Sequence, residues 1–512
     1  MGTSIFEIIG PVMIGPSSSH TAGMARIGMM AHRIADAEIR SVRLDLSPML
    51  RTTYRGHRTD AALIGGTIGL SESDPEIRDS ISLAHEKGID TTVDFLPEGK
   101  YPQNTALITA SCGDGRVVTV LGTSIGGGSI VISAVDGVAM HVSPESYHVF
   151  LWSRQSLNGV IPATERPVQS GKTPEEIITC LSFSTAPQGE WIERLCKTAG
   201  VRKVSVVNPV LEYGTTLPTG KKYDSIQQIC DEAAASHRSL SELAVGYEMS
   251  RSGFSRDVIR GRMMRYWEQM KESVRQGQQE THLLYGLADG KDGKRLLQIA
   301  EAGATISGGI VPLATARALC VMEYNGSMGC IVAAPTAGSS GIVPGCYVTI
   351  QEKYNLPDEK IVDALFVSGL MGVVMAHRNV SFSGSVGGCQ GEVGVSSAIT
   401  SSGLASLFTG KSEEIVHAMA LCLKNLLGLV CDPIAGPIEI PCIKRNAVGV
   451  ANAFVSADMA LAGIQSFIPP DEVIDALVDV EKRLPQELKC ATVGGLACTK
   501  TAQRVREELY KQ

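Results

Sequence analysis

The sequence predicts an α/β N-terminal half followed by a mostly α-helical C-terminal part. From position 105 to position 142, apolar and polar residues alternate, which is the pattern of strands with one buried face. Segments with apolar residues at i, i+3 and i+4 precede these strands and indicate helices. From about position 222 onward, long segments of this helical pattern dominate the chain.

The first predicted domain, residues 1–144, contains both helices and strands. Its expected elements are a helix at 22–39, a strand at 41–47, a helix at 61–70, and alternating strand runs at 105–111 and 116–142. Gly126, Gly127 and Gly128 mark a turn within the last run, because consecutive glycines favour tight turns.

The second predicted domain, residues 145–221, is a small βα module, and the third, residues 222–512, is helical. The module has strand-like pieces at 148–153, 177–183 and 203–209 around a helix at 191–200. The clearest expected helices of the third domain are 227–249, 255–277 and 413–429.

The composition is that of a large folded protein in a reducing compartment. The chain has 512 residues, of which 44% are hydrophobic and 19% charged, so it can bury a sizeable core. The net charge is −7 and the basic residues are scattered, so we expect no nucleic-acid partner. Thirteen cysteines in no pattern, and an N-terminus without signal-peptide features, favour the cytoplasm. The apolar stretch at 364–376 falls short of a membrane span, so we expect no membrane partner.

Three cysteines lie in glycine- and proline-rich surroundings. Cys389 is in GGCQGEVG, Cys431 precedes Asp432-Pro433, and Cys442 follows Pro441. Glycine and proline fix backbone turns, which can aim short side chains at one point. Three converging thiolates can hold a metal centre and leave one position open, as a Lewis-acid catalyst requires. The alternative is that they are small core residues, because no C-x-x-C spacing marks a metal site.

A serine-rich loop precedes the first long helix. The segment GPSSSHTAG offers the hydroxyls of Ser17, Ser18, Ser19 and Thr21 and the imidazole of His20. A helix N-terminus with free N–H groups favours a carboxylate or phosphate. One serine would be explained as an ordinary helix cap, but this number of hydroxyls favours a functional loop.

A second loop, RGHRTD, contains His57, Thr59 and Asp60 ahead of the next helix. A neutral imidazole titrates near neutral pH and can move a proton, so His57 is a candidate acid–base residue. The alternatives are a structural histidine and a helix cap formed by Thr59 or Asp60.

A third loop lies within 325–345 and combines small residues with two prolines. Its hydroxyls, from Thr336, Ser339 and Ser340, can donate hydrogen bonds to an anionic substrate. Close packing between small-residue helices is the alternative explanation.

Several familiar motifs are absent from the sequence. QSGKT at 169–173 resembles the end of a phosphate-binding loop, but Arg166 stands where that motif needs glycine. There is also no GxGxxG after a strand, no GxSxG elbow at a strand-to-helix turn and no HExxH.

Taken together, the segments GPSSSHTAG, GHRTD, MGCIVAAPTAGSSGIVPG, GGCQGEVG and GLVCDPIAGPIEIPCIKRNA resemble the iron–sulfur-dependent bacterial L-serine dehydratases. The resemblance is to single-chain forms with the β-type segment first and the α-type segment second, and it covers most of residues 1–140 and 222–505. It implies that Cys389, Cys431 and Cys442 hold a [4Fe–4S] cluster with one iron free for the substrate. It also implies that the two histidine loops belong to the substrate site.

The same resemblance implies a fold in which a β-type, allosteric-substrate-binding-like half precedes a helical catalytic domain. The segment at 122–130 is similar to the allosteric substrate-binding domain of the family, which implies control by serine and a homo-oligomer. The 145–221 module stands where some relatives carry an ACT regulatory domain, so we interpret it as a degenerate ACT-like module. Arg58 replaces the usual small residue after the loop histidine. Some relatives close the site with a C-terminal cysteine, but this chain ends YKQ with its last cysteine at Cys498, so no such cap is predicted.

The activity implied is the elimination of water from L-serine to aminoacrylate, which gives pyruvate and ammonia, in amino-acid degradation and gluconeogenesis. The free iron would hold the leaving hydroxyl, the loop hydroxyls the carboxylate, and His20 or His57 would take the Cα proton. The alternatives are a related lyase acting on L-threonine or L-cysteine and a non-catalytic iron–sulfur amino-acid sensor. The acid–base groups argue against the sensor, because sensing does not need them.

Overall fold

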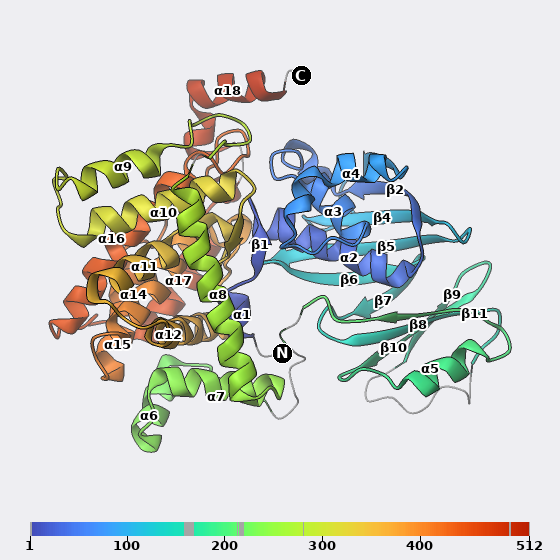
Figure 1. Ribbon diagram of the computed structural model, residues 1–512, viewed down its shortest axis with the longest axis horizontal. Helices are drawn as coiled ribbons and strands as arrows, with labels where there is room; N and C mark the ends of the chain where they lie inside the picture. The colour runs from blue at the N-terminus through green and yellow to red at the C-terminus, as the bar shows by residue number, and fades with distance from the viewer. Residues whose placement is uncertain are drawn as a thin grey trace. The chain divides into compact units, whose positions relative to one another are not determined.

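The computed structural model describes residues 3–157, 168–211, 213, 220–279, 281–490 and 493–510. The chain divides into two compact units. The helical unit consists of Met1–Ser18 and Thr216–Gln512, and the α/β unit is Ser19–Thr215. The predicted fold class is confirmed, because the N-terminal half is α/β with mixed sheets and the region from about 220 is mostly helical (Figure 1).

The α/β unit is built on a six-stranded mixed sheet with the order β3-β2-β4-β5-β6-β7. β2 and β3 are parallel, and the remaining neighbours are antiparallel. The strands are β2 (Ile39–Leu46), β3 (Asp90–Phe95), β4 (Thr105–Cys112), β5 (Val117–Gly126), β6 (Ser129–Val135) and β7 (Val138–Val142). The glycine turn at 126–128 separates β5 from β6 as predicted, whereas the second half of the predicted run is divided again between β6 and β7.

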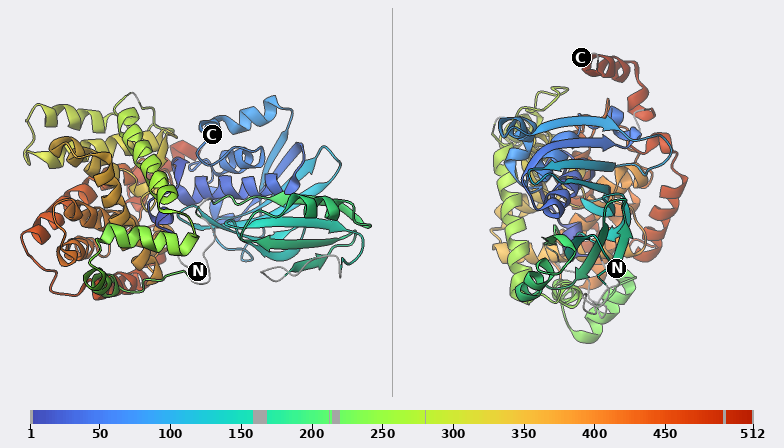
Figure 2. Two further views of the ribbon diagram at one scale, coloured as in Figure 1. Left: turned by 60° about the horizontal axis from the view of Figure 1, so that its bottom comes forward. Right: turned by 90° about the vertical axis from the view of Figure 1, so that its right-hand side faces the viewer.

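Helices α2 (Gly23–Ala35) and α3 (Thr59–Thr67) pack against each other on this sheet, as Figures 1 and 2 show, and α4 (Ser80–Glu86) lies beside α3. Their contact depends on two glycines. A Cβ on Gly28 would lie 2.3 Å from the carbonyl oxygen of Leu63, and one on Gly66 would lie 2.0 Å from that of Ala25. Only glycine permits this approach of two backbones, and it brings the segments before the two helices together.

A second, four-stranded antiparallel sheet has the order β11-β8-β10-β9. Its elements are β8 (Tyr147–Ser153), β9 (Gln169–Lys172), β10 (Ile177–Phe183), α5 (Gly189–Cys196) and β11 (Val201–Val207). Val149, Leu151, Leu181 and Leu195 form its core. This sheet lies within the predicted 145–221 module, parts of which fall outside the described residues. The predicted domain boundaries and the ACT-like interpretation remain predictions.

The helical unit begins with the N-terminal segment rather than at position 222. β1 (Val12–Ile14) pairs antiparallel with β12 (Cys330–Val332), and α1 (Ile5–Ile8) packs against α12 (Asp358–His377). The contacts therefore place this N-terminal segment with the helices.

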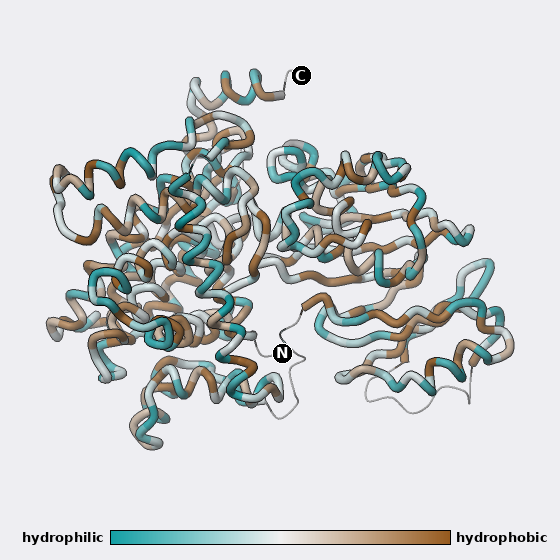
Figure 3. Tube along the Cα trace, viewed as in Figure 1, coloured by the Kyte–Doolittle hydropathy of each residue, from teal (hydrophilic) through white to brown (hydrophobic). Residues whose placement is uncertain are grey.

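The rest of the helical unit is a packed bundle. Its remaining helices are α6 (Ile226–Ser236), α7 (Leu240–Ser252), α8 (Arg256–Gly277), α9 (Asp292–Glu301), α10 (Ile310–Gly326), α11 (Ile342–Tyr354), α13 (Gly384–Gly387), α14 (Val395–Ser406), α15 (Ser412–Lys424), α16 (Cys442–Leu461), α17 (Pro470–Arg483) and α18 (Lys500–Tyr510). Hydrophobic and hydrophilic colours alternate along α9 in Figure 3, as expected for an amphipathic surface helix. Within the described residues, α12 alone is long and apolar enough to cross a membrane, and 78% of its apolar window is buried inside the protein.

Candidate active site

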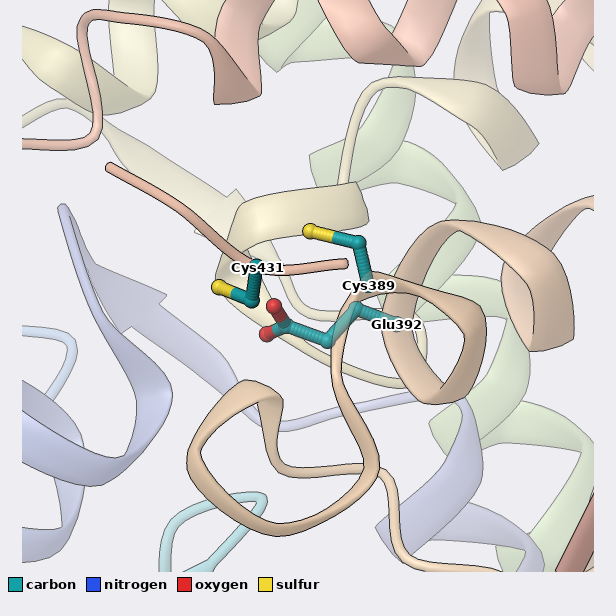
Figure 4. Close-up of side chains that lie close together, drawn as sticks. All are labelled: Cys389, Glu392 and Cys431. Atoms are coloured by element: carbon teal, nitrogen blue, oxygen red, sulfur yellow. The ribbon is translucent and has the colours of Figure 1, made fainter. Parts of the chain in front are cut away.

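The predicted cysteines lie on three segments of the helical unit. Cys389 precedes the π-helical turn η5 (Gln390–Gly394), Cys431 lies in the loop after α15, and Cys442 is the first residue of α16. Their exposed fractions are 2%, 2% and 9%. Among the described residues, the ligand atoms of Cys389, Glu392 and Cys431 all lie within 4.8 Å of one another. Figure 4 shows the Glu392 carboxylate turned toward the Cys431 sulfur.

Cys442 lies outside this compact group but shares its electrostatic environment. Burial is the main factor that raises the pKa of its thiol, and the charges of Cys389, Glu392 and Cys490 raise it further. The pKa of Cys431 is also raised, first by hydrogen bonding with Cys389, then with Cys490, and then by burial. A bound metal would reverse this preference, because it stabilises the thiolate directly.

Cys490 is a fourth thiol that the sequence analysis left out. Its backbone N–H donates to the carbonyl of Cys431 at 2.7 Å, and the N–H of Cys431 donates to the carbonyl of Leu488 at 2.8 Å. This short pairing holds the segment after α17 against the Cys431 loop. The last cysteine, Cys498, is exposed. Spacing gave no signal for Cys490, because it is far from the cysteine motifs in sequence and reaches Cys431 only through tertiary contacts.

Arg445, one turn into α16, connects the cysteine segments. Its Nη1 donates to the Cys389 sulfur at 3.5 Å and to the carbonyl of Val430 at 2.8 Å, and its Nη2 donates to Asp432 Oδ1 at 2.5 Å. Asp432 Oδ2 accepts the N–H of Leu496 at 2.8 Å. A guanidinium beside the Cys389 sulfur stabilises negative charge on that sulfur, as a metal-bound thiolate requires.

Glu392 lies three positions after Cys389, on η5, and was also missed. Its Oε1 accepts the Thr336 hydroxyl at 2.9 Å. Burial raises the pKa of this carboxyl from 4.5 to about 7, although Thr336 and Arg445 act in the opposite direction. The signal for it was present in the sequence, because an acid within GGCQGEVG lies one helical turn from a proposed ligand.

The third predicted loop lies in the same unit. Its Thr336 faces Glu392, but the hydroxyls of Ser339 and Ser340 donate to the carbonyls of Ala334 and Ala337 at 3.1 and 2.8 Å. Both serines are fully buried. Thr336 is therefore the member of this loop with a contact to the cysteine group.

The two predicted histidines lie together in the α/β unit, because each precedes one of the two packed helices. The rings of His20 and His57 stack with centroids 4.4 Å apart. His57 Nδ1 is 3.2 Å from the carbonyl of Thr53, which fixes the proton on Nδ1 and leaves Nε2 as an acceptor. Burial lowers the pKa of His57 to about 4, and burial followed by the charge of His57 lowers that of His20. Both imidazoles are therefore neutral near neutral pH and can accept a proton.

The other residues predicted in the two histidine loops differ in their hydrogen bonds. The Thr21 hydroxyl donates to the carbonyl of His57 at 2.8 Å, and Asp60 accepts the N–H of Ala61 at 2.8 Å. The Thr59 hydroxyl is buried without a hydrogen-bond partner in the described structure. Burial raises the pKa of Asp60. Arg58 adopts a left-handed conformation, with φ of 53°, at the residue before α3.

The serine loop is not an ordinary helix cap. Ser18 begins the π-helical segment η1 (Ser18–Ala22), which runs directly into α2, and no side chain caps that helix. Ser18 is buried, whereas Ser17 and Ser19 are partly buried. The Ser19 hydroxyl lies 3.1 Å from His20 Nδ1.

These features define a protein whose helical domain carries a buried, thiol-rich site suited to a metal centre. All thirteen cysteines are free, so the site's thiols are not consumed by disulfides. Soft thiolate ligands select iron–sulfur clusters, zinc or copper over hard cations.

Comparison with known proteins gives the family. Residues 4–98 match the family model described as serine dehydratase beta chain, and residues 221–497 match serine dehydratase alpha chain. The chain belongs to the serine dehydratase family, in the single-chain arrangement with the beta-type region first.

Relatives with a named activity match this chain over different lengths. A probable L-serine dehydratase alpha chain of Bacillus subtilis is 40% identical over 53% of this chain and 90% of its own length. The L-serine dehydratase of Streptomyces coelicolor is 27% identical over 97% of this chain and 99% of its own, and L-serine dehydratase 1 of Escherichia coli is 26% identical over 96% and 98%.

Proposed function

We propose that this protein is an L-serine ammonia-lyase that holds a [4Fe–4S] cluster and converts L-serine, through aminoacrylate, to pyruvate and ammonia. The observation that carries the proposal is the gathering of buried thiols around Cys431 in a chain of the serine dehydratase family. The proposed cluster ligands are Cys389, Cys431 and Cys442.

The choice of a cluster over a single metal ion rests on the resemblance of the cysteine segments to those of the iron–sulfur-dependent serine dehydratases. The buried thiols of Cys389 and Cys431, with Cys442 close enough to be influenced by the charge of Cys389, are a donor set that suits such a cluster. The Arg445 guanidinium would offset part of the negative charge of such a centre.

The cluster would supply a Lewis-acid iron for the departing hydroxyl. The chain's own residues would supply the remaining chemistry. We assign the substrate carboxylate first to the hydroxyls of Ser17, Ser18 and Ser19 in the serine loop. Thr21, Thr336, Ser339 and Ser340 stay substrate-binding candidates that would line the site, because each donates its one hydroxyl proton to a protein acceptor in this structure. The unpartnered Thr59 hydroxyl, with Asp60 beside it, is a further substrate-binding candidate.

We assign removal of the Cα proton to His20 or His57. The contact of His57 Nδ1 with the Thr53 carbonyl leaves Nε2 as a proton acceptor, and the lowered pKa keeps the ring neutral, which a base requires before it can accept a proton. The sequence and the contacts leave the choice between the two histidines to experiment.

The proposal is tested by replacing Cys431 with serine. The variant should lose the visible absorbance of the cluster and pyruvate formation together, whereas Cys498→Ser, at an exposed thiol outside the site, should keep both. An enzyme with full activity after chelation and exposure to air would contradict the proposal.

The same assay separates the alternatives. Release of 2-oxobutyrate from L-threonine or sulfide from L-cysteine at a higher kcat/KM than pyruvate from L-serine would identify a related lyase. Retained cluster and bound serine without turnover would identify a sensor.

We also propose a cytoplasmic, homo-oligomeric enzyme. Thirteen free thiols fit a reducing compartment. Light scattering of the purified protein measures the oligomer, and a monomer at working concentration would contradict that part of the proposal.

A further inference from the structure

The Glu392 carboxyl lies among the cysteine thiols of the site and pairs with no cationic side chain in the described structure. Its one hydrogen bond in the described structure comes from Thr336, and Arg445 acts on it only at a distance. The Nη atoms of Arg445 are engaged by Cys389, Val430 and Asp432. A carboxylate in such surroundings is costly unless a positive charge approaches it.

The surrounding backbone is shaped around this carboxyl. A Cβ on Gly384 would lie 2.5 Å from Glu392 Oε2 and 3.1 Å from the Cys431 sulfur, and a Cβ on Gly338 would lie 3.4 Å from Oε1. Thr336 holds Oε1, which leaves the lone pairs of Oε2 without a donor in the described structure. Glu392 is partly buried, so part of its surface is in contact with solvent.

The substrate class of the proposed function carries the missing charge. An amino acid binds as a zwitterion, whose hydroxyl and carboxylate are assigned above to the metal centre and to hydroxyl donors. Its ammonium group requires an acceptor, and ideally an anionic one. In the helical unit, Glu392 is the carboxylate that lies within 4.8 Å of the proposed ligand thiols of Cys389 and Cys431.

We propose that Glu392 binds the α-ammonium group of the amino-acid substrate and thereby selects amino acids over hydroxy acids that lack the amino group. Thr336 positions the carboxylate by donating to Oε1, and Gly384 leaves the space that the carboxylate occupies. This inference rests on the proposed function for the identity of the substrate, but it concerns recognition rather than turnover.

The test compares two ligands on the cluster-loaded full-length protein. L-Alanine keeps the ammonium and carboxylate of serine but has no hydroxyl to eliminate, whereas 3-hydroxypropionate keeps the hydroxyl and carboxylate without the ammonium. Calorimetric titration gives the affinity of each ligand without turnover, and the KM for L-serine and the inhibition constant of 3-hydroxypropionate give the same comparison during catalysis.

Glu392→Gln should keep its iron and bind L-alanine and L-serine about 10- to 100-fold more weakly, as expected for the loss of a hydrogen bond between charged groups. Its affinity for 3-hydroxypropionate should be unchanged. Glu392→Asp, which keeps the charge but shortens the side chain, should show a smaller loss of the same selectivity, and it carries the test if the glutamine variant does not fold. Glu323→Gln, which neutralises another buried carboxyl of the helical unit, should change neither affinity.

Loss of iron from Glu392→Gln would overturn the proposal, because the carboxylate would then be a metal ligand. An equal loss of affinity for L-alanine and for 3-hydroxypropionate in Glu392→Gln, or an unchanged affinity for L-alanine, would also overturn it. If the wild type forms no pyruvate but binds L-alanine with the predicted dependence on Glu392, the proposed function fails and this inference stands.

Discussion

Replacing Arg445 with methionine should destabilise the helical unit in a way that depends on Asp432. The substitution keeps an unbranched side chain but removes the donors to Cys389, Val430 and Asp432. The Asp432 and Arg445 side chains are only 4% and 15% exposed, so the carboxylate would be left buried without its cation. Breaking a buried pair on one side costs roughly 3–5 kcal/mol. Because Asp432 would keep the N–H of Leu496, we expect about 3 kcal/mol, the lower end of that range.

Urea unfolding of the cluster-free protein measures this loss, in a double-mutant cycle with Asp432→Asn. The double variant should be less destabilised than the sum of the two single variants, because removing both charges leaves none uncompensated. Arg483→Met breaks the exposed pair with Asp479, whose side chains are 77% and 55% exposed, and should change the free energy of unfolding by less than about 0.5 kcal/mol. Additive single effects, or an Arg445→Met variant as stable as the control, would refute the reasoning.

Three further predictions follow from groups in both units. Burial raises the pKa of Glu323 from 4.5 to about 7, so the folded protein binds more protons than the unfolded chain between these values. The free energy of unfolding of the wild type should therefore fall by about 3 kcal/mol relative to that of Glu323→Gln as the pH rises through that window. A difference in unfolding free energy between the two proteins that does not vary with pH would count against this prediction. Burial lowers the pKa of His57 to about 4, so this ring stays neutral at higher pH and should not titrate near pH 6.5 in the pH profile of kcat/KM. A loss of kcat/KM near pH 6.5 that is present in the wild type and absent from His57→Gln would contradict this prediction. Cys490→Ser should retain iron and visible absorbance, in contrast to Cys431→Ser; iron loss measured by a colorimetric assay would make Cys490 an obligatory ligand.

Most of the fold class was readable because burial imposes periodicity on the sequence. The runs from 105 to 142 became β4 to β7, and the pattern at 255–277 became α8. The predicted helix 227–249 is instead two helices, α6 and α7. His237 turns the chain with a φ of 53°, and Ser239 forms a capping box with Glu242 that begins α7.

The site was only partly readable from the sequence. Cys389, Cys431 and Cys442 stand out because glycine and proline surround them, and two of the three lie within 4.8 Å of each other in the described structure. Cys490 and Arg445 could not be assigned, because their roles depend on which distant segments they contact.

The sequence alone determined the division into an α/β half and a helical half, and the motifs that place the chain in its family, because periodicity and local turn chemistry are properties of neighbouring residues. The tertiary structure decided that the first 18 residues join the helices, that His20 stacks on His57, and that Glu392 faces the thiols without a cation. Each of these depends on packing between segments far apart in the chain, where the free energy of burial and of pairing charges is set by neighbours that no local pattern specifies.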